Sequence, residues 1–420
     1  MCGARIFRTS SFHSGWATVM ALNADNLISR LRQLQTGLLT LGRFTALDAL
    51  ATAKIDGKLH LARQVYTLVD SAHQLSDFLL RFYQVKSEAV QWPTAHRPLL
   101  LDDGTVDRVR LDRDVRSLSS WAARTIKAIE ADSTQDVLLS PVQLMLRSLQ
   151  AAVPQSAATG DACNLNPQNA LSKPVRAFFA PQTSPIDPVF KSTYSLTERP
   201  EPSFSDDLKE LVPYFWTLAM SEAFTSDLCF LNSVEYDGLP IAFHRDMAKQ
   251  AWDEIRHARF YLSCSIDLFP EVESDLAGDS DLAVAIRTFK STGTGLSVPV
   301  EGNLSEAFWN ASLAERLILM QYRTEAPTVQ RLTMKLRSNV CSRYPHIAHG
   351  LEIDRYDEKS HAQIGLNWLK HLIPDPSERK AAIHAADGVR PVLLLTAFAR
   401  HGGESLGSLV TRYSSGEKLP

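Results

Sequence analysis

Two short stretches of the chain pair a carboxylate with an imidazole at a spacing that suits metal binding. Residues 253–257 read DEIRH, and residues 357–361 read DEKSH. In a helix, residues three apart lie on one face about one turn apart, so the Glu and His of each motif can reach one ion. A lone E-x-x-H is a weak signal in a chain with 12 histidines. Two copies, each preceded by Asp, favour a metal site over two solvated helix faces.

A carboxylate-bridged centre for two metal ions needs one further Glu from each pair of helices. Glu222 and Glu254 lie almost equally far from the turn YDGLP, on either side of it, so two antiparallel helices bring them to one level. Glu325 precedes Glu358 by almost the same number of residues as separate the first two. Glu315, the other candidate, would lie about 15 Å out of level at the helical rise of about 1.5 Å per residue. We therefore expect Glu325 to be the ligand.

The predicted centre combines four carboxylates and two imidazoles, enough to hold two ions with two bridging carboxylates. Such ligands suit iron, as Fe²⁺ or Fe³⁺, or manganese, and zinc is a further option. Pro327 follows the third carboxylate closely and leaves the register of that helix open by one turn. Asp354, one turn before the second motif, is expected to pair with an arginine in preference to joining the site. The predicted ligands are Glu222, Glu254, His257, Glu325, Glu358 and His361.

Side chains beside the ligands are expected to orient them. Asp253 and Asp357 are natural acceptors for the histidine N–H of the opposite motif, and Arg256 can pair with the Asp of the other helix. Tyr261 and Tyr322 each lie one turn from a predicted ligand. For these two tyrosines, a redox or substrate-positioning role competes with ordinary core packing.

The ligands require long helices, and the pattern after residue 202 predicts four of them. Capping boxes, SFSD and NLSE, indicate the starts of the first and third helices. Pro213 is expected to kink or restart the first helix, and Pro270 to stop the second. Two antiparallel helices, a long connection over residues 270–302 and two more helices give the connectivity of a ferritin-like four-helix bundle. We expect these helices at residues 203–236, 240–269, 303–342 and 346–374.

The rest of the chain is expected to surround this bundle, giving an all-α fold with an additional helical N-terminal lobe. An Asp-Gly pair inside the lobe predicts a short hairpin or loop. The first residues carry Arg and Ser but no acid, and we expect a disordered upstream extension with Met20 near the natural start, in preference to a transit peptide. The expected segments are an extension at 1–21, the lobe at 22–153, a Pro-rich irregular connector at 154–202, the bundle at 203–375 and a helical or irregular tail at 376–420.

The composition limits the partners and the compartment. A net charge of -3 gives no overall basic field to attract nucleic acid or an anionic membrane. No apolar run reaches the roughly 18 residues needed to span a bilayer. The five cysteines are scattered, with no C-x-x-C, which argues against a disulfide framework or a zinc–thiolate site. We therefore expect a cytoplasmic protein.

The residues of the predicted site resemble the ferritin-like superfamily, and DEIRH looks like the iron-binding motif of bacterial multicomponent di-iron monooxygenases. About residues 180–375 resemble an uncharacterised bacterial ferritin-like family, the 455 class of domains of unknown function, which is related to tRNA-hydroxylating di-iron enzymes. The resemblance implies a di-iron centre that reacts with dioxygen. The chain departs from the family in its N-terminal lobe and at Ser360, where DEIRH has arginine. The matching segments are Glu222, LPIAFHRDMAKQAWDEIRHARFYL, AERLILMQYRTEAP and DEKSHAQIGLNWLKHL.

Together these features predict a non-haem di-iron oxygenase or oxidase that hydroxylates, desaturates or N-oxygenates a small-molecule substrate. The chain has no flavin or NAD motif, so a separate electron donor or reductase is expected. Two alternatives stay open. One is a metal storage or detoxification protein, against which the large extra lobe argues, and the other is a tRNA-modifying hydroxylase, which the net charge does not favour. The lobe could serve as the surface of a homodimer, as a lid or as a dock for a carrier protein.

Overall fold

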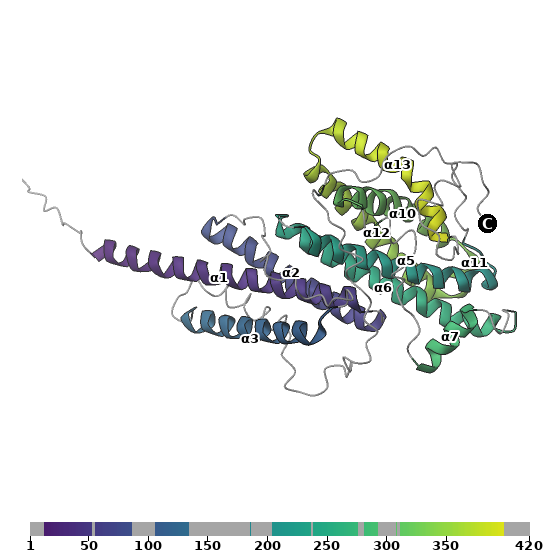
Figure 1. Ribbon diagram of the computed structural model, residues 1–420, viewed down its shortest axis with the longest axis horizontal. Coiled ribbons are helices and arrows are strands. Elements are labelled where there is room, and N and C mark those ends of the chain that lie inside the picture. The colour runs from purple at the N-terminus through teal and green to yellow at the C-terminus, as the bar shows by residue number, and fades with distance from the viewer. Residues whose placement is uncertain are drawn as a thin grey trace, which may run out of the picture.

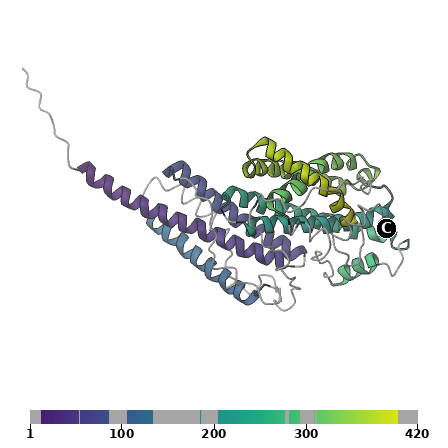
Figure 2. The ribbon, with the colours of Figure 1, turned by 45° about the horizontal axis from the view of Figure 1, so that its top comes forward.

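The computed structural model describes the chain over residues 12–52, 55–85, 106–133, 185, 204–236, 238–275, 281–292, 308 and 311–398. Every regular element in these ranges is a helix, which confirms the predicted all-α class for this part of the chain. None of the helices in the same ranges is both long and apolar enough to cross a membrane. Figures 1 and 2 show three long N-terminal helices lying beside a second group of helices built from the later part of the chain.

The N-terminal lobe consists of α1 (Phe12–Ala51), α2 (Ile55–Tyr83) and α3 (Arg108–Ser133). α1 packs against both of the others and reaches beyond them at its N-terminal end (Figure 1). Its buried leucines recur at alternating spacings of three and four residues, which places them on one face of the helix. They include Leu31, Leu34, Leu38 and Leu41.

The lobe differs from the prediction at its start. α1 begins at Phe12, so the predicted extension over 1–21 contains the first turns of a helix, and residues 1–11 lie outside the described part of the chain. The Ala and Met residues of this stretch favour a helix, and lengthening an existing helix costs far less than nucleating one. The predicted Asp-Gly hairpin, residues 134–153 and all of the connector except Pro185 also lie outside the described residues.

The second group of helices starts with an antiparallel hairpin of α5 (Leu208–Glu235) and α6 (Ile241–Val272). Gly238 lies in the turn between them with a positive φ of 81°, a conformation that glycine adopts without strain. α6 is the central helix, because it packs against α5, against α2 of the lobe and against α12 (Pro345–Leu372). It is therefore buried on more than one face.

Three predicted features of this hairpin need correction. Asp207, not the SFSD box, caps α5, since its carboxylate accepts a hydrogen bond from the Lys209 N–H at 2.9 Å. α5 runs as one helix through Pro213, so it does not restart there. α6 continues past Pro270 to Val272. Each proline removes a single backbone hydrogen bond near a helix end, and the packing of the neighbouring apolar residues outweighs that loss.

The third long helix is continuous but changes its winding. α9 (Leu313–Arg316), η4 (Leu317–Glu325) and α10 (Ala326–Lys335) follow one another directly. Ser312 and Glu315 form a capping box at its start, so Glu315 has a structural role away from the ligands. The predicted capping box NLSE lies outside the described residues.

η4 is a π-helix, whose hydrogen bonds reach back five residues. Even a side chain follows this spacing, since the Thr324 Oγ1 donates to the Leu319 carbonyl at 2.8 Å. Pro327 lies directly downstream and has no N–H to give to the preceding turn, which weakens the ordinary α register there. The local distortion expected beside Pro327 thus takes the form of a wider turn, and Glu325 is its last residue.

α12 completes the arrangement by packing along η4 and α10. α12 ends at Leu372, before Pro374, as predicted. The third helix, expected to reach residue 342, ends at Lys335. The short helix α11 (Asn339–Arg343) follows, and the break between α11 and α12 at Tyr344 lies in the predicted region of 342–346. α7 (Asp281–Thr292) lies within the connection between the two helix pairs, and α13 (Pro376–Phe398) lies within the tail. The described chain therefore has two helix pairs joined by a long connection, in the predicted order.

The lobe is attached to the hairpin by polar and aromatic contacts as well as by a shared apolar core. The fully buried Lys58 ammonium of α2 pairs with the fully buried Asp227 carboxylate of α5, and it also donates to the Ala49 carbonyl at 2.7 Å. The Tyr66 ring of α2 stacks on Trp252 of α6, with ring centroids 5.5 Å apart and an angle of 15°. The lobe is thus bonded to both helices of the hairpin.

Candidate metal centre

Four of the six candidate ligands occupy the middle of two buried helical stripes, on α6 and α12, whose ends are mostly apolar. Inward-facing residues of α6 and α12 recur at alternating spacings of four and three, the pattern of a core-facing stripe. The two stripes are in register, because each member of the first has a counterpart at the same offset in the second. On α6 they are Phe243, Met247, Gln250, Glu254, His257 and Tyr261, and on α12 they are Ile347, Leu351, Asp354, Glu358, His361 and Gly365.

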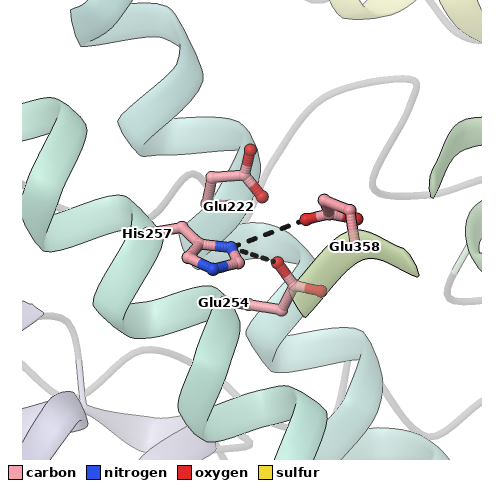
Figure 3. Close-up of side chains that lie close together, drawn as sticks. All are labelled: Glu222, Glu254, His257 and Glu358. Atoms are coloured by element: carbon pink, nitrogen blue, oxygen red, sulfur yellow. Dashed lines mark ion pairs between the residues drawn. The ribbon is translucent and has the colours of Figure 1, made fainter. Parts of the chain in front are cut away.

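Four of the predicted ligands, from three helices, form a group that could hold a metal ion. Glu222 of α5, Glu254 and His257 of α6 and Glu358 of α12 each offer an atom within 4.8 Å of the others. Figure 3 shows the four side chains close together, with dashed lines that mark the ion pairs from one nitrogen of His257 to the carboxylates of Glu254 and Glu358. Its Nδ1 lies 3.4 Å from Glu254 Oε2 and 3.5 Å from Glu358 Oε1.

The other two predicted ligands lie on the far side of the same carboxylates. His361 Nδ1 lies 3.1 Å from Glu254 Oε1 and 3.6 Å from Glu358 Oε2. Glu325, at the end of η4, is buried beside Glu358, whose carboxylate acts on its pKa. Glu254 and Glu358 therefore each turn one oxygen toward each imidazole. This arrangement suits two bridging carboxylates between two ions.

The two motifs hold each other's histidines in place. His257 Nε2 lies 3.3 Å from Asp357 Oδ2, and His361 Nε2 lies 3.2 Å from Asp253 Oδ2. An ionised carboxylate only accepts, so each Nε2–H donates outward and each Nδ1 faces the cluster, where it could bind a metal ion once deprotonated. The Arg256 guanidinium donates to Asp253 and, at 3.1 Å, to Asp357. These are the crossed contacts that the sequence pattern predicted.

The cluster has buried ligand atoms with no hydrogen-bond partner. His257 Nδ1, His361 Nδ1, Glu254 Oε2 and Glu358 Oε2 are all in this state. Leaving a buried polar group unpaired costs about 1–3 kcal/mol, and more when the group is charged. Divalent cations would satisfy all four atoms at once and compensate the surrounding negative charge. The residues present therefore fit a pair of metal ions of the type that nitrogen and oxygen ligands prefer.

Burial and mutual repulsion raise the pKa of three of the four glutamates predicted as ligands. Burial, then the neighbouring Glu254 carboxylate, raises the pKa of Glu358 to about 8, although His361 opposes the shift. The pKa values of Glu222 and Glu325 lie well above their usual range for the same two reasons. Glu254 differs, because the attraction of the two imidazoles outweighs burial and holds its pKa well below the usual range.

The surrounding carboxylates also favour protonated histidines in the metal-free protein. Burial alone would lower the pKa of His257, but Asp354 and other acids raise it well above its usual value. His361 behaves in the same way, with Glu254 and Glu358 as the main acids. The metal-free cluster therefore holds protons on its imidazoles and on most of its carboxyl groups near neutral pH. Bound metal must displace those protons.

We expect the affinity for a divalent metal to rise with pH between about pH 6 and pH 8. A group with a raised pKa keeps its proton below that pKa, so each displaced proton weakens binding by about tenfold for every pH unit of acidification. Glu358 imposes this penalty below about pH 8. Calorimetric titration with Mn²⁺ at three pH values, in two buffers of different ionisation enthalpy, measures both the affinity and the protons released. A pH-independent affinity would contradict the assignment.

Asp253→Asn and Asp357→Asn are each expected to weaken metal binding by about 10–100-fold, because the partner of a ligating histidine fixes its tautomer and orientation. Asp253 supports His361, and Asp357 supports His257. Competition against a chelator measures the change. Asp112→Asn, in an exposed ion pair of α3, removes the same charge without touching the site and serves as the control. Equal affinities in all variants would refute the positioning role.

The two tyrosines considered from the sequence have different places. Tyr261 is buried, and its hydroxyl donates to Asp354, whose other oxygen lies 3.4 Å from His257 Nδ1. Tyr322 is only partly buried, and the Arg323 guanidinium lies over its ring, 4.9 Å from the ring centroid. Asp354 therefore belongs to the site. Among the described residues its side chain pairs with Tyr261 and His257, so the expected ion pair with an arginine is wrong.

Two glutamines of the site were not expected. Gln250 Nε2 donates to Glu254 Oε1 at 2.9 Å, and Gln250 Oε1 accepts from Gln321 of η4 at 3.4 Å. Gln321 lies directly against α12 at Gly365. A Cβ added at Gly365 would lie only 2.2 Å from the Cβ of Gln321, so the close approach requires glycine. The signal that could have indicated Gln250 is its position one turn before the Glu of the first motif, which matches Asp354 in the second.

No family model, curated protein or solved structure matches this chain. The chemistry of the site therefore has to be inferred from its own geometry.

Proposed function

We propose that the chain is a non-haem dimetal oxygenase or oxidase, built on a ferritin-like four-helix bundle, that uses dioxygen to oxidise a small organic substrate. The observation that carries this proposal is the pair of imidazole Nδ1 atoms that make no hydrogen bond and face two shared carboxylates. Iron is the metal that we favour for these ligands, and manganese is the alternative. The two helix pairs and their long connection support the bundle assignment.

Two bound iron ions would supply the redox chemistry that dioxygen activation needs. The chain's own residues hold the ligands and restrict access of water. Glu254, His257, Glu358 and His361 are all at most 3% exposed. Arg256, Asp253 and Asp357 fix the imidazoles from outside, so the ligand geometry is set before metal or substrate arrives. Such preorganisation reduces the cost of arranging the site during the reaction.

The reaction class determines what else is required. Insertion of one oxygen atom of dioxygen into a substrate reduces the other atom to water, which consumes two electrons and two protons from outside the substrate. We therefore include a separate electron donor in the proposal, in keeping with the absence of a flavin or NAD motif from the sequence. A desaturase would need the same two electrons, with water formed from both oxygen atoms.

The proposal is tested by loading the full-length protein with Fe²⁺ under anaerobic conditions and then adding dioxygen. We expect two iron ions per chain and dioxygen uptake in proportion to the bound iron. Glu254→Ala, which removes a shared carboxylate, should show neither. Less than one iron per chain in the unchanged protein would overturn the proposal. Continued iron uptake far beyond two ions per chain would instead support a storage protein.

A further inference from the structure

The two metal positions of the proposed site are not equivalent. Gln250 and Asp354 occupy matching places on α6 and α12, one turn before Glu254 and Glu358. One is a neutral amide and the other is a carboxylic acid. The stripes of α6 and α12 therefore differ in charge one turn before the ligands Glu254 and Glu358.

Asp354 is placed to bind a metal ion through one oxygen. It is 1% exposed, and its Oδ2 accepts a hydrogen bond from the Tyr261 hydroxyl of the opposite helix. Its Oδ1 accepts no hydrogen bond and lies 3.4 Å from His257 Nδ1, the atom that faces the cluster. The tyrosine therefore orients the carboxylate so that its free oxygen is on the His257 side.

Gln250 cannot supply the same ligand to the other side. Its amide N–H donates to Glu254 Oε1, and its carbonyl oxygen accepts from Gln321. Both ends of the amide are therefore used within the protein. The His361 side keeps Glu325 and the two shared carboxylates but gains no additional acid from this position.

We propose that Asp354 is a seventh metal ligand and that the position beside His257 binds a divalent cation before, and more tightly than, the position beside His361. The inference rests on the proposed dimetal site. A further negative oxygen strengthens the attraction for a cation where little solvent can screen it. Glu222, Glu254, His257 and Glu358 form one compact group without His361 or Glu325, in agreement with this order. Asp354 lies outside that group of four and adjoins it through its 3.4 Å contact with His257 Nδ1.

The test is a titration of the metal-free, full-length protein with Mn²⁺, in which electron paramagnetic resonance measures the concentration of free Mn²⁺ after each addition. The unchanged protein should bind two ions in separate steps. Asp354→Asn should weaken the first step by about 10–100-fold, the range found for groups that orient or tune a metal site, and should bring the two steps together. Glu325→Gln should weaken the second step and leave the first unchanged.

Reciprocal variants guard against a simple loss of folding. Gln250→Asp adds the missing acid on the other side and should tighten the second step, an effect that a damaged fold would not produce. Tyr261→Phe keeps the ring but frees Asp354 and should weaken the first step less than Asp354→Asn does. Two unchanged steps in Asp354→Asn would overturn the inference while leaving the dimetal proposal intact. Failure of the unchanged protein to bind Mn²⁺ or Fe²⁺ would instead overturn the dimetal proposal itself.

Discussion

Replacement of Glu254 by alanine is expected to abolish binding of both metal ions, not of one. Its two oxygens lie 3.4 Å from His257 Nδ1 and 3.1 Å from His361 Nδ1, so the side chain is shared by both positions. Glu222 and Glu325 lie on separate sides of the cluster, and the loss of either should cost one ion. Elemental analysis after dialysis against excess metal gives the number of ions bound per chain.

Glu352→Ala is the matched control for this experiment, since Glu352 is an exposed acid of α12 that pairs with Arg355 at 3.5 Å. It should keep two ions per chain. Circular dichroism should show the same helix content in both variants. Retention of one tightly bound ion in Glu254→Ala would mean that the carboxylate is not shared and that the two positions are independent.

Lys58→Ala is expected to lower the free energy of unfolding by about 3–5 kcal/mol, because it leaves the buried Asp227 carboxylate without its cation. Both side chains are fully buried at the junction of the lobe and the hairpin. Burial deprives the carboxylate of hydration, and without the ammonium group the Coulombic attraction that offsets this loss is missing. Urea denaturation followed by circular dichroism measures the change.

The double variant Lys58→Met with Asp227→Leu should regain most of the lost stability, since apolar side chains of similar size often replace a buried ion pair at little cost. Arg116→Ala removes one partner of the exposed pair with Asp112 and should change stability by about 1 kcal/mol or less. A Lys58→Ala variant as stable as Arg116→Ala would show that the pair does not hold the lobe to the hairpin.

The sequence contained enough to place most of the helices and the crossed histidine contacts. Helical periodicity is a local property, and the spacing of Asp253, His257, Asp357 and His361 follows from the helix alone. Antiparallel pairing about the YDGLP turn then brought Glu222 level with Glu254, as the structure shows. Distances along each helix are determined directly by the sequence, and the crossed contacts then followed from placing both motifs at one site.

Other features depend on which side chains of neighbouring helices a residue faces, and these could not be predicted in the same way. The π-helical winding of η4 leaves the apolar pattern almost unchanged, so only Pro327 hinted at it. For Asp354 the sequence left a place in the site and an ion pair with an arginine as alternatives, and only the positions of Tyr261 and His257 decide between them. Lys58 gave no signal in the sequence, because its partner Asp227 is remote in the chain and belongs to another helix.

The crossed contacts of Asp253 and Asp357 make the two motifs mutually dependent. Each helix supplies a histidine whose orientation is set by an acid from the other helix. Neither motif is therefore complete by itself. Without α12, His257 would lack Asp357, the acceptor of its Nε2–H. The geometry of the candidate ligands is therefore a product of tertiary assembly. It forms only when two segments about a hundred residues apart have docked in the correct register.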